Sequence, residues 1–389
     1  MTRDLRLLAA SLFCWGIGEG LFIYFQPIYL ERLGADPLQI GVILGLAGAV
    51  MTVSHIPAGA LADHFGRKTV MLSAWVIGTV AAWLMFLAKD LWPFVLGALL
   101  YALSVFVLSP MSSYITAARG EWTVARALTT TSAGFNAGLI LGPLAGGRLA
   151  EALGLRSIYG IAAGLFAIST LVVIGVRSQP KHVASSERRY AGLLRNRSLG
   201  RFLLLIFVAM FAMYFSWPLA PNFLQSQRLI SIADLGLIGS FNALGIVVLS
   251  LGLGRMSWRR GFLAAEALVA CSVLLLWLGR GLSVFALGYF MAGGFRVAHS
   301  LMNAGVEKRV HPSELGLSFG LAETAFGVAI VIGAPLAGLL YRAHPAAPFP
   351  IALGLVVLAL GLTVSGRFGI RDSSSPAALQ VSLSEESRP

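Results

Sequence analysis

Ionisable side chains in the middle of long apolar segments are the residues of this sequence that could do chemistry. Glu19, Arg296 and Glu323 each stand in such a segment. A charged side chain at the centre of a membrane costs about 3 kcal/mol on insertion scales, so each is a candidate functional residue. A carboxyl group in apolar surroundings can exchange a proton near neutral pH. Glu19 is therefore a candidate for trading a proton against a solute; a permanent structural pairing with another helix is the alternative.

Arg296 begins a polar stripe on one expected helix. His299 and Asn303 follow at i+3 and i+7, which places them on one helical face. This face disfavours lipid, so we expect it to line a cavity or contact protein. Arginine cannot lose its charge, so Arg296 would bind an anion or neutralise an acid such as Glu19. His299 could relay a proton or be simply hydrogen-bonded, and Glu323 would line the same cavity or seal the contact between two halves.

The composition indicates the elements that hold these residues. The 389 residues are 57% hydrophobic and 12% charged, with a mean hydropathy of +0.81. Soluble domains are about a quarter charged, so an ordinary soluble protein is excluded. This length has room for about twelve helical spans of ~20–25 residues. Cys14 and Cys271 both lie in apolar runs, so we expect neither a disulfide framework nor a metal cluster.

Apolar runs recur between short polar breaks, and an apolar solvent leaves α-helices as the default. We expect helices at 5–30, 38–61, 69–88, 91–117, 124–150, 155–176, 200–225, 231–253, 261–279, 282–305, 314–341 and 348–369. The first is expected to be a retained span and not a cleaved signal peptide. The predicted organisation is a six-helix bundle at 1–176, a cytoplasmic linker at 177–198, a second six-helix bundle at 199–369 and a disordered cytoplasmic tail at 370–389.

The net charge of +12 would suggest nucleic acid as the partner of a soluble protein. Here most of the Lys and Arg residues fall in the segments that share a side with the N-terminus. This asymmetry follows the positive-inside rule, which predicts that both termini are cytoplasmic. We therefore expect the lipid bilayer, and not nucleic acid, as the environment of the basic residues.

The two halves of the sequence resemble each other. The segment from Asp36 to Gly41 resembles the one from Asp234 to Gly239, and Gly142-Pro143-Leu-Ala-Gly146 resembles Ala334-Pro335-Leu-Ala-Gly338. Duplicated halves are typical of transporters that bind substrate at the interface of the two repeats, near the membrane midplane. The sequence thus predicts an all-α integral membrane protein with twelve spans in two pseudo-symmetric bundles.

A motif follows the second expected span. Gly59-Ala-Leu-Ala-Asp63-His64-Phe-Gly66-Arg67-Lys68 resembles the signature G-x-L-a-D-r-x-G-r-k of the major facilitator superfamily, with His64 in place of the usual Arg. The resemblance implies that spans one, four, seven and ten line a central cavity. It also implies that Asp63 meets the start of span eleven, near residues 313–314, and latches the halves together on the cytoplasmic side. The gating residues would be Gly59, Asp63, Gly66, Arg67 and Lys68; the alternative is that Arg67 and Lys68 only anchor the topology.

A second motif lies in span five. Its residues Gly138, Gly142, Pro143, Gly146 and Gly147 resemble the G-x3-G-P-x2-G-G signature of the exporters in that superfamily. Glycines four residues apart make a flat helix face, and proline bends the helix, which suits a sliding contact between the halves; ordinary close packing is the alternative. Span four, 91–117, has no charged residue where proton-coupled exporters often have an arginine, so any coupling depends on other residues.

These features predict a secondary active transporter that exports amphipathic or drug-like compounds by proton-coupled antiport. We expect a functional monomer in the plasma membrane, with Glu19, Arg296, Glu323 and His299 in coupling or binding. Further substrate contacts are expected from Asn303, Trp217, Tyr24, Tyr289 and Asn136. The alternative is a symporter or facilitator for a polar or anionic metabolite such as a sugar or organic acid, and a non-transport membrane sensor is more remote. The zinc-protease, hydrolase and nucleotide-loop motifs are absent from the sequence, so we expect neither an enzyme nor a cofactor.

Overall fold

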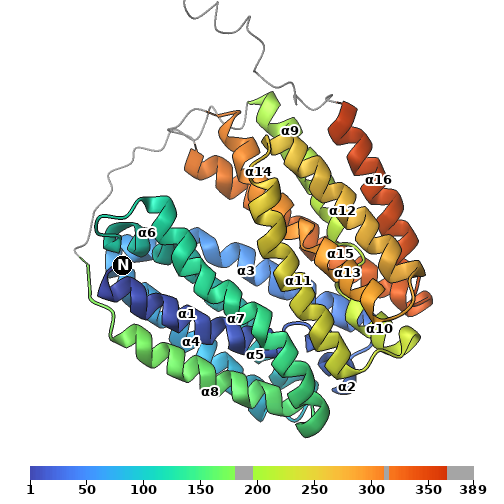
Figure 1. The fold of residues 1–389 in the computed structure, drawn as a ribbon, viewed down its shortest axis with the longest axis horizontal. Coiled ribbons are helices and arrows are strands. Elements are labelled where there is room, and N and C mark those ends of the chain that lie inside the picture. The colour runs from blue at the N-terminus through green and yellow to red at the C-terminus, as the bar shows by residue number, and fades with distance from the viewer. Residues whose placement is uncertain (180–195, 311–314, 366–389) are drawn as a thin grey trace, which may run out of the picture.

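The computed structural model describes residues 1–179, 196–310 and 315–365 (Figure 1). Most of the predicted linker at 177–198 and the whole predicted tail at 370–389 lie outside these residues. The predicted bundles at 1–176 and 199–369 fall within them, apart from residues 311–314 and 366–369. Over the part of the chain that is described, every expected span is helical.

The first half contains α1 (Arg3–Phe22), α2 (Gln26–Arg32), α3 (Pro37–Phe65), α4 (Arg67–Leu87), α5 (Leu91–Leu103), the 3-10 helix η1 (Ser104–Val107), α6 (Leu108–Ala118), α7 (Val124–Leu153) and α8 (Leu155–Ile174). The second half contains α9 (Arg197–Tyr214), α10 (Ala220–Arg228), α11 (Ile232–Leu253), α12 (Trp258–Leu278), α13 (Leu282–Ala292), α14 (Gly294–Glu307), α15 (Leu315–Ala343) and α16 (Pro348–Ser365). Within the described residues, ten stretches are long and apolar enough to cross a membrane. The glycine-rich α7 and the divided span α13–α14, which carries the Arg296 stripe, complete the twelve spans.

Four of the spans are not the continuous helices that the sequence predicted. Span one divides into α1 and α2 at residues 23–25, span four passes through η1, span seven divides around Pro218, and span ten divides at Gly293. Proline lacks the N–H that would continue a helix. Gly293 lies so close to α11 that a Cβ there would be 2.6 Å from the Ile246 nitrogen. The divided spans are the four that the resemblance assigns to the central cavity.

The repeated segments of the two halves pack against each other. A Cβ at Gly41 of α3 would lie 2.3 Å from the carbonyl oxygen of Ala334, next to Pro335 of α15. In the other half-to-half contact, a Cβ at Gly239 of α11 would lie 3.2 Å from the Cβ of Pro143 in α7. The two sequence repeats therefore form two matching seams, α3–α15 and α7–α11, that join the halves.

The close contacts of the α7–α11 seam lie toward one end of the molecule. We call the side of residues 1–3, 66 and 254–257 proximal, and the side of the turns at 33–36, 154 and 229–231 distal. The close glycine contacts of α7 with α11 involve residues 143–147 and 232–239, near the distal ends of both helices. Figure 1 shows the ribbons of the halves together near α2 and α10 and diverging toward the proximal side.

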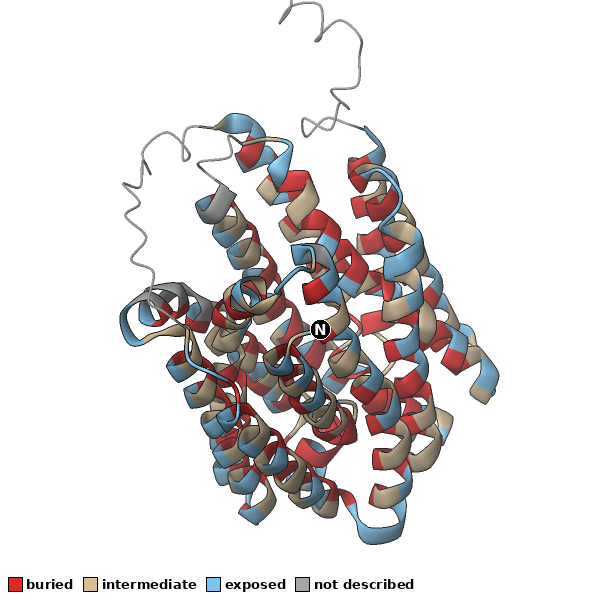
Figure 2. Cartoon of the chain, turned by 60° about the vertical axis from the view of Figure 1, so that its left-hand side comes forward, coloured by how far each residue is buried: buried red, intermediate tan, exposed pale blue. Residues whose placement is uncertain are grey.

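Buried residues follow the inner faces of the helices, and exposed residues follow the outer faces (Figure 2). Many of the exposed residues are large and apolar, for example Trp92, Leu171 and Val53. In water such a surface would be costly, whereas in a bilayer it meets acyl chains. The burial pattern therefore agrees with a multi-pass membrane protein.

Candidate functional site

Glu19 lies near the middle of span one and is half-buried. Its Oε2 atom accepts a hydrogen bond of 2.8 Å from the hydroxyl of Tyr101 on α5. The Tyr101 ring stacks on Trp15 and Phe166, with ring centroids 6.3 and 5.8 Å away. Because the packed ring fixes the hydroxyl, the carboxyl group has one defined neutral partner within its own half.

Arg296 is exposed although it lies midway along span ten. Its guanidinium interacts electrostatically with Glu19 and Tyr24 of the first half and with Tyr214 of its own half. The ion pairs in direct contact among the described residues are His299–Glu323 and Asp36–Arg342. The charge of Arg296 therefore acts on Glu19 across the halves, although the two residues form no salt bridge.

His299 and Glu323 form the polar contact between α14 and α15. The imidazole Nε2 lies 2.9 Å from Glu323 Oε2, and Asn303 donates a 3.4 Å hydrogen bond to Oε1 of the same carboxylate. The His299 ring also lies 4.2 Å from the ring centroid of Phe326. The structure thus joins three of the predicted site residues into one cluster, within the second half.

Tyr24, Trp217 and Tyr289 form an aromatic cluster where spans one, seven and ten meet. The ring centroids of Trp217 and Tyr289 are 5.0 Å apart, and Tyr24 lies 6.3–6.5 Å from both. The Tyr24 hydroxyl donates a 2.9 Å hydrogen bond to Asn242 of α11, whose amide donates a 2.7 Å bond to the carbonyl of Tyr289. Tyr289 is fully buried, so this cluster closes the distal end of the site that contains Glu19 and Arg296.

Replacing Tyr24 by Phe is expected to open the distal side partially. The change removes one hydrogen bond between the halves, worth about 1 kcal/mol, and should raise the distal-open population about five-fold. A cysteine introduced at Tyr214, in a protein whose Cys14 and Cys271 are replaced by Ser, reports the opening through its rate of reaction with a thiol reagent added on the distal side.

Tyr159→Phe is the matched control for this measurement. The Tyr159 hydroxyl is buried in the first half and has no hydrogen-bond partner among the described residues. Equal labelling rates in the Tyr24→Phe and Tyr159→Phe proteins would show that the Tyr24–Asn242 bond does not hold the distal side closed.

Three further polar contacts join the halves at the distal side. The Asn222 amide donates to the Glu31 carboxylate and to the carbonyl of Pro27. The Glu151 carboxylate at the end of α7 accepts a 3.1 Å hydrogen bond from the backbone N–H of Ala233, in the first turn of α11. A negative charge at a helix N-terminus is stabilised by the helix dipole.

The third contact is the exposed ion pair Asp36–Arg342, at 3.8 Å. Asp36 also caps the N-terminus of α3 in a capping box with Gln39. These distal contacts could not be predicted from the sequence, because Glu31, Glu151 and Arg342 lie near span ends, where charged residues are common. Their pairing depends on how the two halves dock.

Only part of the predicted gating loop can be placed. The surroundings of Gly59 and the side chain of Asp63 are not described, and residues 313–314 lie outside the described part of the chain. Gly66 joins α3 to α4 with a φ of 91°, a backbone conformation that favours glycine. Arg67 donates a 3.2 Å hydrogen bond to Gln179, and Lys68 donates a 3.0 Å bond to the carbonyl of Ile174, both in the first half.

The glycines of the span-five motif have two different neighbours. Cβ atoms at Gly138, Gly142 and Gly146 would collide with the backbone of α1, in the same half. Gly147 instead approaches Ile232 and Gly236 of α11, and Pro143 lies on that side as well. The expectation of a contact between halves therefore holds for Pro143 and Gly147. It is wrong for the other three glycines, because residues four apart share the face that packs on α1.

Among the described residues, Asn136 and Glu266 form no hydrogen bond with the members of this site. Asn136 is half-buried on α7 and makes no hydrogen bond among the described residues. Glu266 is fully buried between α12 and α16. There it accepts a 3.2 Å hydrogen bond from Thr363, while Arg259 donates to backbone carbonyls of α16.

Comparison with known proteins gives two kinds of relative. Multidrug resistance protein MdtG of Enterobacter lignolyticus is 31% identical over 199 residues, which are 49% of this chain and 47% of that protein. MdtG of Escherichia coli strain 55989 is 34% identical over 191 residues, 46% of each chain. The matched region thus spans about half the length of these curated relatives.

Solved structures of transporters share the whole fold. A point mutant of the nucleoside transporter NupG superposes with a TM-score of 0.78 at 15% identity, covering 93% of this chain and 98% of its own. The human organic anion transporter MFSD10 gives 0.67 at 18% identity, covering 93% and 99%. The sequence profile of the Major Facilitator Superfamily matches residues 8–201 and 202–382, one match for each half. Together with the two-bundle architecture, these matches establish that the chain belongs to the major facilitator superfamily.

Proposed function

We propose that this protein exports amphipathic, drug-like compounds from the cytoplasm in exchange for protons. The observation that carries the proposal is the position of Glu19, a half-buried acid that interacts electrostatically with Arg296 of the other half and with Tyr24 of the aromatic cluster. An acid supplies a proton-exchanging group, and the rings supply apolar contact area for a substrate. The relatives named multidrug resistance proteins support the same substrate class.

The proposed mechanism is alternating access of the central site. We place both termini on the cytoplasmic side of the cell membrane, as the basic residues of the proximal side indicate. The described state, with its distal contacts made, is then inward-facing. Substrate enters from the cytoplasm while Glu19 is charged, and the halves rock so that the distal contacts break. Protonation of Glu19 from outside releases the substrate, and the protonated carrier returns to the inward-facing state. In this mechanism the protein acts as a monomer.

In this mechanism, Arg296 sets the charge balance of the central site. A fixed positive charge opposite Glu19 favours the ionised carboxylate. When Glu19 takes up a proton, Arg296 is left without its acidic counterpart, so the site changes its net charge by one unit. A cationic substrate is favoured in the first state and repelled in the second, which links binding to the proton.

Proteoliposomes with an imposed proton gradient test this function. The purified protein is expected to move lipophilic cations and neutral aromatic compounds against their gradients when protons flow the other way. Uptake of a sugar or organic acid together with protons, and no movement of the lipophilic panel, would contradict export and favour a symporter.

Replacing Arg296 by Gln is expected to move the pH profile of transport to higher pH by about one unit, because the carboxylate loses its electrostatic support. Transport in the proteoliposomes is measured between pH 5 and 9 for the variant and the wild type. The Arg260→Gln protein, which changes an exposed arginine at the proximal end of α12, serves as the control and should keep the wild-type profile. An unchanged profile in the Arg296→Gln protein would remove Arg296 from the proton-coupling site.

A further inference from the structure

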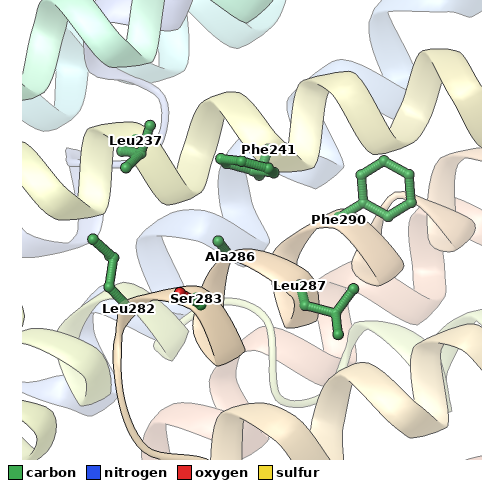
Figure 3. Close-up of a pocket in the computed structure, with 7 residues that line it drawn as sticks. All are labelled: Leu237, Phe241, Leu282, Ser283, Ala286, Leu287 and Phe290. Carbon is green, nitrogen blue, oxygen red and sulfur yellow. The ribbon is translucent and has the colours of Figure 1, made fainter.

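A groove runs along the outer face of the second half, between α11 and α13, outside the central site (Figure 3). Its volume is about 440 Å³, within the range of pockets that hold a small ligand, roughly 300–1,000 Å³. Side chains from both helices line it, among them Leu237 and Phe241 of α11 and Leu282, Ala286 and Leu287 of α13. Apart from the Ser283 hydroxyl, the side chains that line the groove are apolar.

The groove opens toward the membrane and not toward the other half. Phe241 is 39% exposed and Leu287 is 47% exposed, whereas their neighbours on the inner face are buried. Tyr289 of the aromatic cluster and its hydrogen-bond partner Asn242 point inward from the same two helices. The groove and the central site therefore lie on opposite sides of the contact between α11 and α13.

The shape of the groove comes from residue size along this seam. Near the middle of the membrane the helices are in backbone contact, because a Cβ at Gly245 would lie 2.1 Å from the carbonyl oxygen of Phe290. Toward the distal ends the small side chains of Ala286 and Ser283 leave the space between the helices unfilled. The groove is therefore an apolar slot that is wide toward the distal ends of the helices and closes toward the middle of the membrane.

A positive charge stands at the distal mouth of this slot. Arg280 lies two residues before Leu282, in the turn between α12 and α13. It is exposed, and in the part of the chain that is described its guanidinium makes no hydrogen bond or ion pair. Its neighbour Arg228, in contrast, donates to the carbonyl of Trp277 and lies over the ring of Phe223. Arg280 is thus available to a phosphate group at the level of the lipid headgroups.

We propose that the groove is a lipid site, in which one acyl chain of a phospholipid lies between α11 and α13 while Arg280 binds its phosphate. The surrounding medium supplies this occupant at high concentration, and the slot combines an apolar channel in the hydrocarbon layer with a cation at the interface. The proposal depends on the membrane-spanning fold and not on the transported substrate.

Photolabelling of the full-length protein in liposomes tests the site. The probe is phosphatidylglycerol with a diazirine on one acyl chain, and labelled peptides are mapped by mass spectrometry. Labelling of residues 237–241 and 282–290 is expected to exceed that of Val357 and Leu358, exposed on the lipid-facing side of α16, at least five-fold. Equal labelling of the two regions would overturn the proposal.

Variants separate the two parts of the site. Ala286→Trp, and Ser283→Phe at a more exposed position, should fill the slot and reduce labelling to the level of α16, whereas Leu358→Trp should not. Arg280→Gln should reduce labelling by the phosphatidylglycerol probe several-fold but leave labelling by a diazirine-bearing fatty alcohol unchanged. Persistent labelling in the filled variants would show that no chain occupies the slot. An Arg280→Gln protein that behaves like the wild type would show that the phosphate is not bound there.

Discussion

Replacing Glu19 by Gln is expected to reduce proton-driven transport to the level of protein-free liposomes. Glutamine keeps the size of the side chain and can still accept the hydrogen bond from Tyr101, but it cannot bind or release a proton. Exchange of a labelled for an unlabelled neutral aromatic compound, which requires neither the proton cycle nor the negative charge of Glu19, should continue. The measurement compares gradient-driven uptake with counterflow exchange in the same proteoliposomes.

The matched control is Glu266→Gln, which changes an acid that is buried within a span of the second half. Glu266 lies between α12 and α16 and contacts Thr363, away from the space between the halves. Its substitution should leave both activities close to wild type. If the Glu19→Gln protein keeps proton-driven transport, or if both variants lose it equally, Glu19 is not the coupling residue.

Replacing Gly236 by Leu is expected to prevent the distal side from closing. Even a Cβ at this position would lie 2.3 Å from the carbonyl oxygen of Pro143 and 2.9 Å from the Cα of Gly147. Overpacking of this kind costs about 1–3 kcal/mol, which corresponds to a shift of roughly 5- to 150-fold toward the distal-open state. Transport should fall in proportion, and a cysteine at Tyr214 should react faster with a thiol reagent from the distal side.

Gly164→Leu is the control for the added side chain. Gly164 of α8 has no atom within 4 Å of the position of a Cβ, so leucine should fit there without a shift between states. Faster labelling in the Gly236→Leu protein alone is the expected result. Wild-type transport in that protein would mean that α7 and α11 do not need this close approach.

Much of the fold could be predicted because it follows from local properties of the chain. The length of each apolar segment fixes a helical span, and the expected ranges fall on the observed helices. The repeats around Gly41, Gly239, Pro143 and Pro335 lie at the two seams. Of these segments, only the span-five motif was expected to make a contact between the halves, since glycine marks close helix approach. The breaks in four spans were not predicted. A continuous helix and a divided one, such as the span that divides at Gly293, have equally apolar sequences.

The candidate site was predicted less completely. A charge within an apolar segment is visible in the sequence, so Glu19, Arg296 and Glu323 could be identified individually. That His299 pairs with Glu323, and that Glu151 caps α11, depends on the rotation of helices about their axes and on the docking of the halves. These two contacts correspond to no local pattern in the sequence.

The central claim is that the two ends of the molecule open in turn, and paired distance measurements test it most directly. After replacement of Cys14 and Cys271, spin labels are placed on the distal side at Leu153 and Leu229 and on the proximal side at Val124 and Met256, all exposed positions in opposite halves. Electron–electron resonance is recorded at pH 5 and pH 8, with and without a transported compound. The account predicts that the distal distance lengthens whenever the proximal distance shortens. Two distances that change in the same direction, or that stay constant in all four conditions, would contradict it.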